Sequence, residues 1–191
     1  MRMLEERIAR EATVIAPDVL RVDMFLNHMI DTDLLGELGR EFYRLFGGDA
    51  ITKILTVEAS GIAIACAAAS YFRVPVLFAK KGRSNKTLDA DVYSSEIHSF
   101  TKDVTTGISV ARRFLPADDR VLVIDDFLAH GSAVRGLCDI IGQSGAALAG
   151  VGIAIEKGFQ PGGAVLREQG IRLESLAIIE SMDGGEIRFS R

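Results

Sequence analysis

The chain has 191 residues, 48% of them hydrophobic, and a formal net charge of −4 at pH 7. This composition can bury one α/β core, so we expect residues 1–191 to form a single domain. The negative net charge does not indicate a protein that binds nucleic acid. No apolar run is long enough to span a membrane, and the amphipathic start Met1–Ile8 does not resemble a signal peptide, so we expect a cytoplasmic protein.

The pattern of apolar residues predicts strands that alternate with helices. Asp31-Thr32 can cap a helix whose apolar face runs from Leu34 to Leu45 and which ends at Gly47-Gly48. Further helices are predicted at 61–71 and 133–143, and strands at 51–57, 74–80, 121–125, 148–155, 171–180 and 186–189, the last at a sheet edge. This alternation predicts an α/β fold with a doubly wound, mainly parallel sheet flanked by helices.

The segment 81–115 interrupts this pattern. It is polar over residues 87–95, whereas Tyr93, Ile97 and Phe100 indicate short extended pieces. Because a connection of this length is rarely without structure, we expect a partly β-structured, flexible flap, and long insertions of this kind often act as lids.

The cysteines and histidines show no pattern of metal ligands. Cys66 and Cys138 each lie in a helical pattern of small residues, with no second Cys or His at ligand spacing, so we expect buried free thiols. His28, His98 and His130 share neither a triad nor a metal-binding spacing. We therefore expect no metal site built from protein side chains.

Residues 121–133 join an apolar strand to two acids and to a loop of small residues that begins a helix. The apolar run before Asp125 and Asp126 predicts a parallel strand that surfaces at its carboxyl end, where open α/β sheets bind ligands. The loop from Ala129 to Ala133 allows close backbone approach, and the next helix adds partial positive charge. The junction therefore suits a phosphorylated sugar. The alternative is a strand that ends in solvated acids before a Ser-capped helix.

A second loop, Glu58-Ala-Ser-Gly61, also joins a predicted strand to a helix. Its amides and the Ser60 hydroxyl can hold another anionic group, although an ordinary Ser N-cap would give the same pattern. The chain has no Gly-x4-Gly-Lys-Ser/Thr sequence, which argues against a P-loop kinase. A basic run lies at the end of the next predicted strand: Lys80, Lys81, Arg83 and Lys86. This run can attract a polyanionic small ligand, or it can be an ordinary solvated loop.

Lys157 and Phe159 follow the predicted strand 148–155, at the same end of the sheet as the two loops. An aromatic face and a cation suit a flat, oxygen-rich heterocycle, with the ring on Phe159 and a carbonyl near Lys157. The alternative is a lysine at a strand end beside a core phenylalanine.

These segments resemble the type I phosphoribosyltransferases. Residues 121–133 are similar to the motif with which that family binds 5-phosphoribosyl 1-diphosphate (PRPP). The resemblance covers nearly the whole chain in order, and other segments are similar to the bacterial members of the family that act on xanthine: residues 18–28, 56–62, 99–102 and 155–160.

The resemblance implies roles for the acids and the two loops. Asp125 and Asp126 would hold the ribose hydroxyls and face positive charge that develops on the sugar. The 5′-phosphate would be bound by Ala129, His130, Gly131, Ser132 and Ala133, and the diphosphate by Glu58, Ala59, Ser60 and Gly61. His130 stands where many relatives carry Thr or Asn, which leaves its backbone role intact and its side-chain role in doubt.

The resemblance also implies a base site and a partner. Residues 1–30 would form a hood over the base, with Leu20 and Asn27 in contact with xanthine beside Lys157 and Phe159. Taken from the residues alone, Leu20 is a core residue and Asn27 a turn residue. A basic residue from near Lys80 and Lys81 would bind PRPP in the neighbouring subunit, which implies a homodimer.

The implied reaction converts xanthine and PRPP to xanthosine 5′-monophosphate and diphosphate, with Mg²⁺ held mainly by PRPP and water. Two alternatives stay open. Another purine, guanine or hypoxanthine first and adenine second, would leave the chemistry unchanged. A PRPP-sensing regulator without turnover would share the fold, but known examples attach a DNA-binding winged helix, and the residues before Asp31 are too few to form one.

Overall fold

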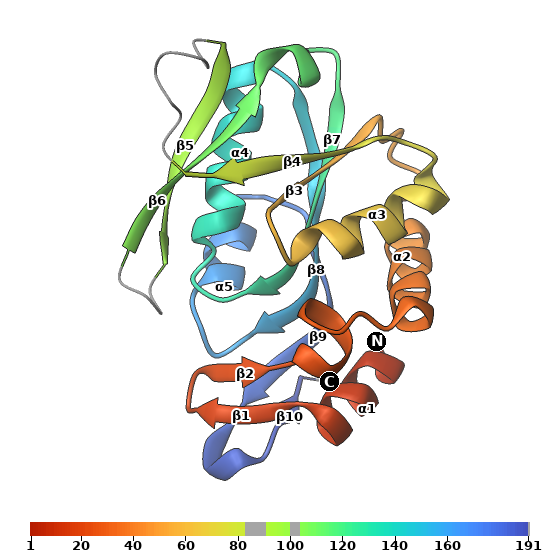
Figure 1. Ribbon diagram of the computed structural model, residues 1–191, viewed down its shortest axis with the longest axis vertical. Helices are drawn as coiled ribbons and strands as arrows, with labels where there is room; N and C mark the ends of the chain where they lie inside the picture. Colours follow the sequence, from red (N-terminus) through yellow and green to blue (C-terminus); the bar gives the residue numbers. More distant parts are fainter. Residues whose placement is uncertain (83–90, 100–103, 191) are drawn as a thin grey trace.

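The computed structural model describes residues 1–82, 91–99 and 104–190 (Figure 1). Its helices are α1 (Arg2–Glu11), α2 (Thr32–Phe46), α3 (Gly61–Phe72), α4 (Ser132–Ser144) and α5 (Gly162–Glu168), with a π-helical turn at Asp23–Asn27 and 3₁₀ turns at Arg112–Phe114 and Asp183–Gly185. Its strands are β1 (Thr13–Ala16), β2 (Val19–Arg21), β3 (Lys53–Val57), β4 (Val76–Lys81), β5 (Val92–Ser99), β6 (Val104–Ala111), β7 (Arg120–Leu128), β8 (Ala147–Lys157), β9 (Leu173–Ser181) and β10 (Arg188–Phe189).

Within the described residues, eight strands form one sheet in the order β10-β9-β8-β7-β3-β4-β6-β5, and β1 pairs with β2 in a separate hairpin. The five strands from β9 to β4 in this order are parallel to one another. β10 pairs antiparallel with β9 at one edge, and β6 and β5 continue the sheet in antiparallel pairing at the other. The predictions of a mainly parallel sheet and of a C-terminal edge strand are therefore confirmed.

Helices cover both faces of this sheet. Figure 1 shows α2 and α3 on one face, and α4 and α5 on the other. The first face buries a cluster that includes Phe42, Ile64 and Ile124, whereas the second buries one that includes Val123 and Leu166. Neighbouring residues of β7 thus enter opposite clusters, which explains why parallel strands with two covered faces are continuously apolar in sequence.

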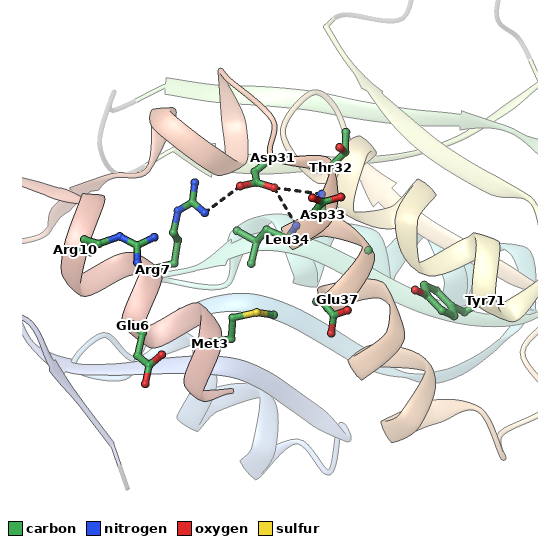
Figure 2. A pocket seen from close by; sticks show the side chains of 11 residues that line it. Met3, Glu6, Arg7, Arg10, Asp31, Thr32, Asp33, Leu34, Glu37 and Tyr71 are labelled. Atoms are coloured by element: carbon green, nitrogen blue, oxygen red, sulfur yellow. Dashed lines mark hydrogen bonds and ion pairs between the residues drawn. The ribbon is translucent and has the colours of Figure 1, made fainter.

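The N-terminal helix is tied to the start of α2. As predicted, Asp31 caps α2, and its carboxylate accepts hydrogen bonds from the amides of Asp33 at 3.1 Å and Leu34 at 3.0 Å. Arg7 of α1 lies 2.9 Å from the same carboxylate. The Leu34 amide and the Arg7 charge both lower the pKa of Asp31. Figure 2 shows this ion pair in a pocket of about 650 Å³ that Tyr71 of α3 also lines. None of the predicted site residues lines this pocket.

Three features differ from the sequence-based expectation. The strand that we expected to end at Asp125 continues to Leu128, because β7 stays paired with β8 as far as Glu156. The short helix α5 was not predicted. Cys66 is exposed rather than buried, since the Ala-rich helix α3 is apolar on all sides and its sequence does not mark the core face, whereas Cys138 is partly buried.

The segment 81–115 contains β5 and β6, which extend the sheet and pack against α4 (Figure 1). At Gly136 of α4, a Cβ atom would lie only 2.7 Å from the Ile97 side chain of β5, so glycine permits this close approach. Parts of the predicted flap and basic run lie outside the described residues: Arg83, Lys86, Phe100 and Lys102. In the part of the chain that the structure describes, no helix is both long and apolar enough to cross a membrane.

Candidate active site

The acidic pair lies near the end of β7 and is buried rather than exposed. Asp125 is 4% and Asp126 8% exposed, and the Asp126 amide donates a 3.0 Å hydrogen bond to the Asp125 carboxylate. Burial raises the pKa of Asp125 well above its usual range and the Asp126 charge raises it further, whereas the hydrogen bond from the Asp126 amide and the Lys81 charge oppose the shift. Two acids this close together in a buried site favour a ligand that brings hydroxyl donors or positive charge.

The carbonyl groups of the loop after β7 accept hydrogen bonds from the Arg135 side chain and from the Gly162 amide. Gly131 has φ 77° and precedes α4, which begins without a side-chain cap, so its first amides are not used within the helix. The Arg135 side chain donates to the His130 carbonyl at 2.8 Å, and the Gly162 amide donates to the Ala129 carbonyl at 3.0 Å. The carbonyl groups are therefore occupied, while helix-terminal amides remain to bind an anion.

The second loop meets the acidic pair. Gly61 begins α3, and a Cβ atom there would lie 2.7 Å from Asp125 Oδ1. The Glu58 carboxylate accepts a 2.5 Å hydrogen bond from the Lys81 amide, and the Glu58–Ala59 peptide bond is cis. Ser60 makes no side-chain cap of α3, contrary to the alternative in which it serves only as an N-cap. The neighbouring parallel strands β3 and β7 thus bring both predicted anion loops to the carboxyl ends of the strands (Figure 1).

Lys157 ends β8 beside β7 and reaches the N-terminal hairpin. Its ammonium donates a 2.5 Å hydrogen bond to the carbonyl of Asp18, in the turn between β1 and β2, and lies 5.7 Å from the centre of the Phe127 ring. Burial lowers the pKa of Lys157. Phe127 was not predicted as a site residue, and the apolar pair that follows the acids in the sequence is the signal that could have revealed it.

The other residues predicted for the base site differ in exposure. Phe159 follows β8 and is 41% exposed, and Asn27 is exposed at the end of the π-helical turn. Leu20 is 7% exposed and belongs to a core cluster, opposite Val14 in the hairpin. Lys157, by contrast, is fixed to the β1–β2 turn of the hood by its hydrogen bond to Asp18.

Lys80 and Lys81 are exposed at the end of β4, next to the second loop. Within the described residues, two buried polar side-chain atoms lack hydrogen-bond partners, Thr56 Oγ1 and Gln160 Oε1. Thr56 precedes the second loop, and Gln160 follows Phe159. Buried polar atoms are nearly always paired, so both atoms are unusual, and both lie beside predicted site residues.

Behind the site, Glu156 joins β8, α5 and β9. It is 3% exposed, and its two carboxylate oxygens accept hydrogen bonds from Arg167 at 2.7 and 2.8 Å and one from Ser175 at 2.5 Å. Burial opposes ionisation of Glu156, but the Arg167 and Ser175 bonds outweigh it, and its pKa is lowered. This pairing anchors α5, whose first residue, Gly162, supports the loop after β7.

Comparison with known proteins identifies the family of the chain. A family model, the phosphoribosyl transferase domain, matches residues 21–165. The chain is 54% identical over 190 residues to a protein named xanthine phosphoribosyltransferase from Ruminiclostridium cellulolyticum, and the match covers 100% of both chains. The protein of the same name from Lacticaseibacillus casei is 53% identical over 100% of this chain and 98% of its own.

A solved structure, the adenine phosphoribosyltransferase of Giardia lamblia in complex with 9-deazaadenine, matches with a TM-score of 0.75 over 92% of this chain and 96% of that one. At 19% identity this similarity shows the shared fold alone. The predicted fold is therefore confirmed. From the family model and the full-length relatives, the chain belongs to the phosphoribosyltransferase family and, within it, to the xanthine phosphoribosyltransferases.

Proposed function

We propose that the chain transfers the phosphoribosyl group of PRPP to xanthine, which yields xanthosine 5′-monophosphate and diphosphate. The observation that carries this proposal is the buried pair Asp125 and Asp126, which lies between two amide-rich loops at the sheet edge where Lys157 meets the hood. The chain's full-length relatives are named for the same reaction.

The sugar would be held by the acidic pair. Asp125 and Asp126 accept hydrogen bonds from the ribose 2′- and 3′-hydroxyls, and their charge faces the oxocarbenium character that develops as the diphosphate leaves. The pKa of Asp125 is raised in the ligand-free protein. The hydroxyl donors of the bound sugar and the positive charge that develops on it would lower this pKa and favour the ionised carboxylate. Electrostatic stabilisation then increases as the transition state forms.

The two loops would bind the two phosphate ends of PRPP. The amides of residues 129–133 receive the 5′-phosphate, and the loop 58–61 receives the diphosphate. Lys80 and Lys81 add positive charge close to the second loop. The distance between the loops is then set by the neighbouring strands β3 and β7, which orient the bond that breaks.

Xanthine would lie against Lys157. An ammonium favours a base with carbonyl oxygens and partial anionic character over adenine, which presents a donor amine at C6. Phe159 offers an exposed aromatic face, and Leu20 and Asn27 would contact the base from the hood. Binding would replace the Asp18 carbonyl, or share Lys157 with it, since an ammonium has three donors.

We propose Mg²⁺ as the cofactor. Among the described residues, no three His, Cys, Asp or Glu side chains are grouped closely enough to hold a metal ion. The ion would arrive with PRPP, bound by phosphate oxygens and water. When bound there, Mg²⁺ would neutralise negative charge on the departing diphosphate.

We also propose that two copies of the chain associate. Phe78 of β4 and Phe114 after β6 are 37% and 48% exposed, and both line a groove of about 430 Å³ that includes Lys80. An apolar groove beside the basic end of β4 suits a second copy of the chain. Sedimentation should give a dimer at micromolar concentration. A fully active monomer would contradict this.

The proposed reaction is tested by a turnover assay with PRPP, Mg²⁺ and each purine in turn. We expect the highest kcat/KM with xanthine, lower values with guanine and hypoxanthine, and the lowest with adenine. A higher kcat/KM with another purine would show that the protein has a different base specificity. Binding of PRPP without turnover of any base would favour the regulator.

A further inference from the structure

The proposed mechanism leaves one buried hydroxyl without a role. Thr56 lies on β3, two residues before Glu58, and is 0% exposed. Among the described residues, nothing pairs with its Oγ1 atom. An unpaired buried hydroxyl is destabilising because it has lost its hydration and gained no partner. A hydrogen bond that forms when the site is loaded would explain why the chain retains it.

Gly61 shows which group is within reach. A Cβ atom at Gly61 would overlap Thr56 Oγ1 and would lie 2.7 Å from Asp125 Oδ1, so hydroxyl and carboxylate approach the same point from β3 and β7. Glycine leaves that point free of a side chain. The full burial of Thr56 argues against direct contact with a substrate, so Asp125 is the partner that the geometry favours.

Asp125 has the capacity to accept this hydrogen bond. Its Oδ1 atom receives one bond, from the Asp126 amide, and each carboxylate oxygen can accept two. The other charged groups that act on it are Asp126 on its own strand and Lys81 at the end of β4. A hydroxyl donor would favour the ionised carboxylate, the form that the proposed transfer needs.

We propose that the Thr56 hydroxyl donates a hydrogen bond to the Asp125 carboxylate in the substrate-loaded protein and so acts as a positioning residue for phosphoribosyl transfer. This inference rests on the proposed function, because Asp125 must be ionised and oriented only if it faces the reacting sugar. Thr56 acts through Asp125 and does not itself contact the substrate.

The pH dependence has a definite sign. Hydrogen bonding to the charged form of Asp125 lowers its pKa, and removal of the hydroxyl therefore raises it. The acidic limb of kcat should move to higher pH in Thr56→Val, so that the loss of activity is larger at low pH than at high pH. A role confined to packing would lower activity equally at every pH.

The test compares Thr56→Val with Thr56→Ser. Valine keeps the shape and removes the donor, so we expect kcat for xanthine to fall about tenfold or more, with little change in the KM for xanthine. Serine keeps the hydroxyl and should restore most of the activity. Thermal stability of Thr56→Val should be unchanged or higher, because an unpaired hydroxyl has been removed from the ligand-free protein.

Thr52→Val is the matched control, because Thr52 immediately precedes the first residue of β3, far from the acidic pair. The Thr52 hydroxyl donates to Asp119 at 2.8 Å and accepts from the Arg120 amide at 2.9 Å, so this variant should lose stability and keep its kcat. Wild-type kcat and pH profile in Thr56→Val would overturn the inference, as would a large loss of its stability, which would reveal a structural partner. Absence of turnover in the wild-type protein would instead refute the proposed function.

Discussion

The two ends of the candidate site are built in different ways. At the phosphate end, residues 129–133 offer main-chain amides, and the loop is braced by Arg135 and Gly162 through its carbonyl groups. At the base end, Lys157 meets the Asp18 carbonyl and the Phe127 ring, so three separate segments contribute. A backbone site depends on local conformation, whereas a side-chain site depends on how distant segments pack. The two ends should therefore respond to substitution independently.

The largest effect is expected between the two ends, at the acidic pair. Asp125→Asn and Asp126→Asn each remove a charge that faces the oxocarbenium ion while keeping the shape of the side chain. We expect kcat to fall about 10²-fold or more in each, by analogy with the loss of one preorganised electrostatic group. Steady-state assays at saturating xanthine and PRPP measure this, and near-wild-type turnover in both variants would refute the assignment.

The same substitution should have the opposite effect on stability. Because the folded-state pKa of Asp125 is raised, its contribution to stability is present at low pH and is lost as the pH rises through that pKa. Asp125→Asn should therefore be at least as stable as wild type at neutral pH in the ligand-free state. Thermal unfolding across a pH series checks this, and a marked loss of stability would show that the carboxylate serves the fold.

At the base end, Lys157→Met keeps much of the stem and removes the donor. A charge-assisted hydrogen bond contributes about 1.5–3 kcal/mol, so kcat/KM for xanthine should fall about 10- to 150-fold. Hypoxanthine lacks the 2-oxo group and should lose less if that oxygen is the one contacted. An unchanged ratio of kcat/KM for the two bases would place base selection elsewhere, at Asn27 and the hood.

At the phosphate end, Gly131→Val places a β-branched side chain at φ 77° and a Cβ atom 3.1 Å from Arg135 Nη1. Because the side chain obstructs approach of the 5′-phosphate to the loop amides, the Kd for PRPP should rise roughly 10- to 10²-fold, with a smaller change in thermal stability. Gly142→Val on the same helix has no neighbouring atom within 4 Å of its Cβ and serves as the control. Calorimetry that gave equal PRPP affinity for both variants would show that this loop is not the phosphate site.

The smallest effect is expected at Phe127. Its ring faces the Lys157 ammonium at 5.7 Å, and a cation–π contact of this kind contributes about 0.5–1 kcal/mol. Phe127→Leu should therefore lower kcat/KM for xanthine only about two- to sixfold and leave the KM for PRPP unchanged. A loss as large as that of Lys157→Met would mean that the ring contacts the base directly.

The same contrast explains what the sequence could predict. The alternation of strands and helices, the Asp31 cap and the loops at 58–61 and 129–133 are local patterns, and the structure contains them. The burial of Asp125 was not predicted because it depends on the pairing of β7 with β8 beyond the acids. The approach of Lys157 to Asp18 joins residues far apart in sequence, and no local pattern encodes it.

The independence of the two ends is tested most directly by measuring two quantities in two variants: the KM for PRPP and the ratio of kcat/KM for xanthine to that for hypoxanthine. We predict that Gly131→Val raises the KM for PRPP and leaves the ratio unchanged, whereas Lys157→Met changes the ratio and leaves the KM for PRPP unchanged. If either variant changed both quantities, or if their effects were exchanged, the assignment of separate phosphate and base ends would be contradicted.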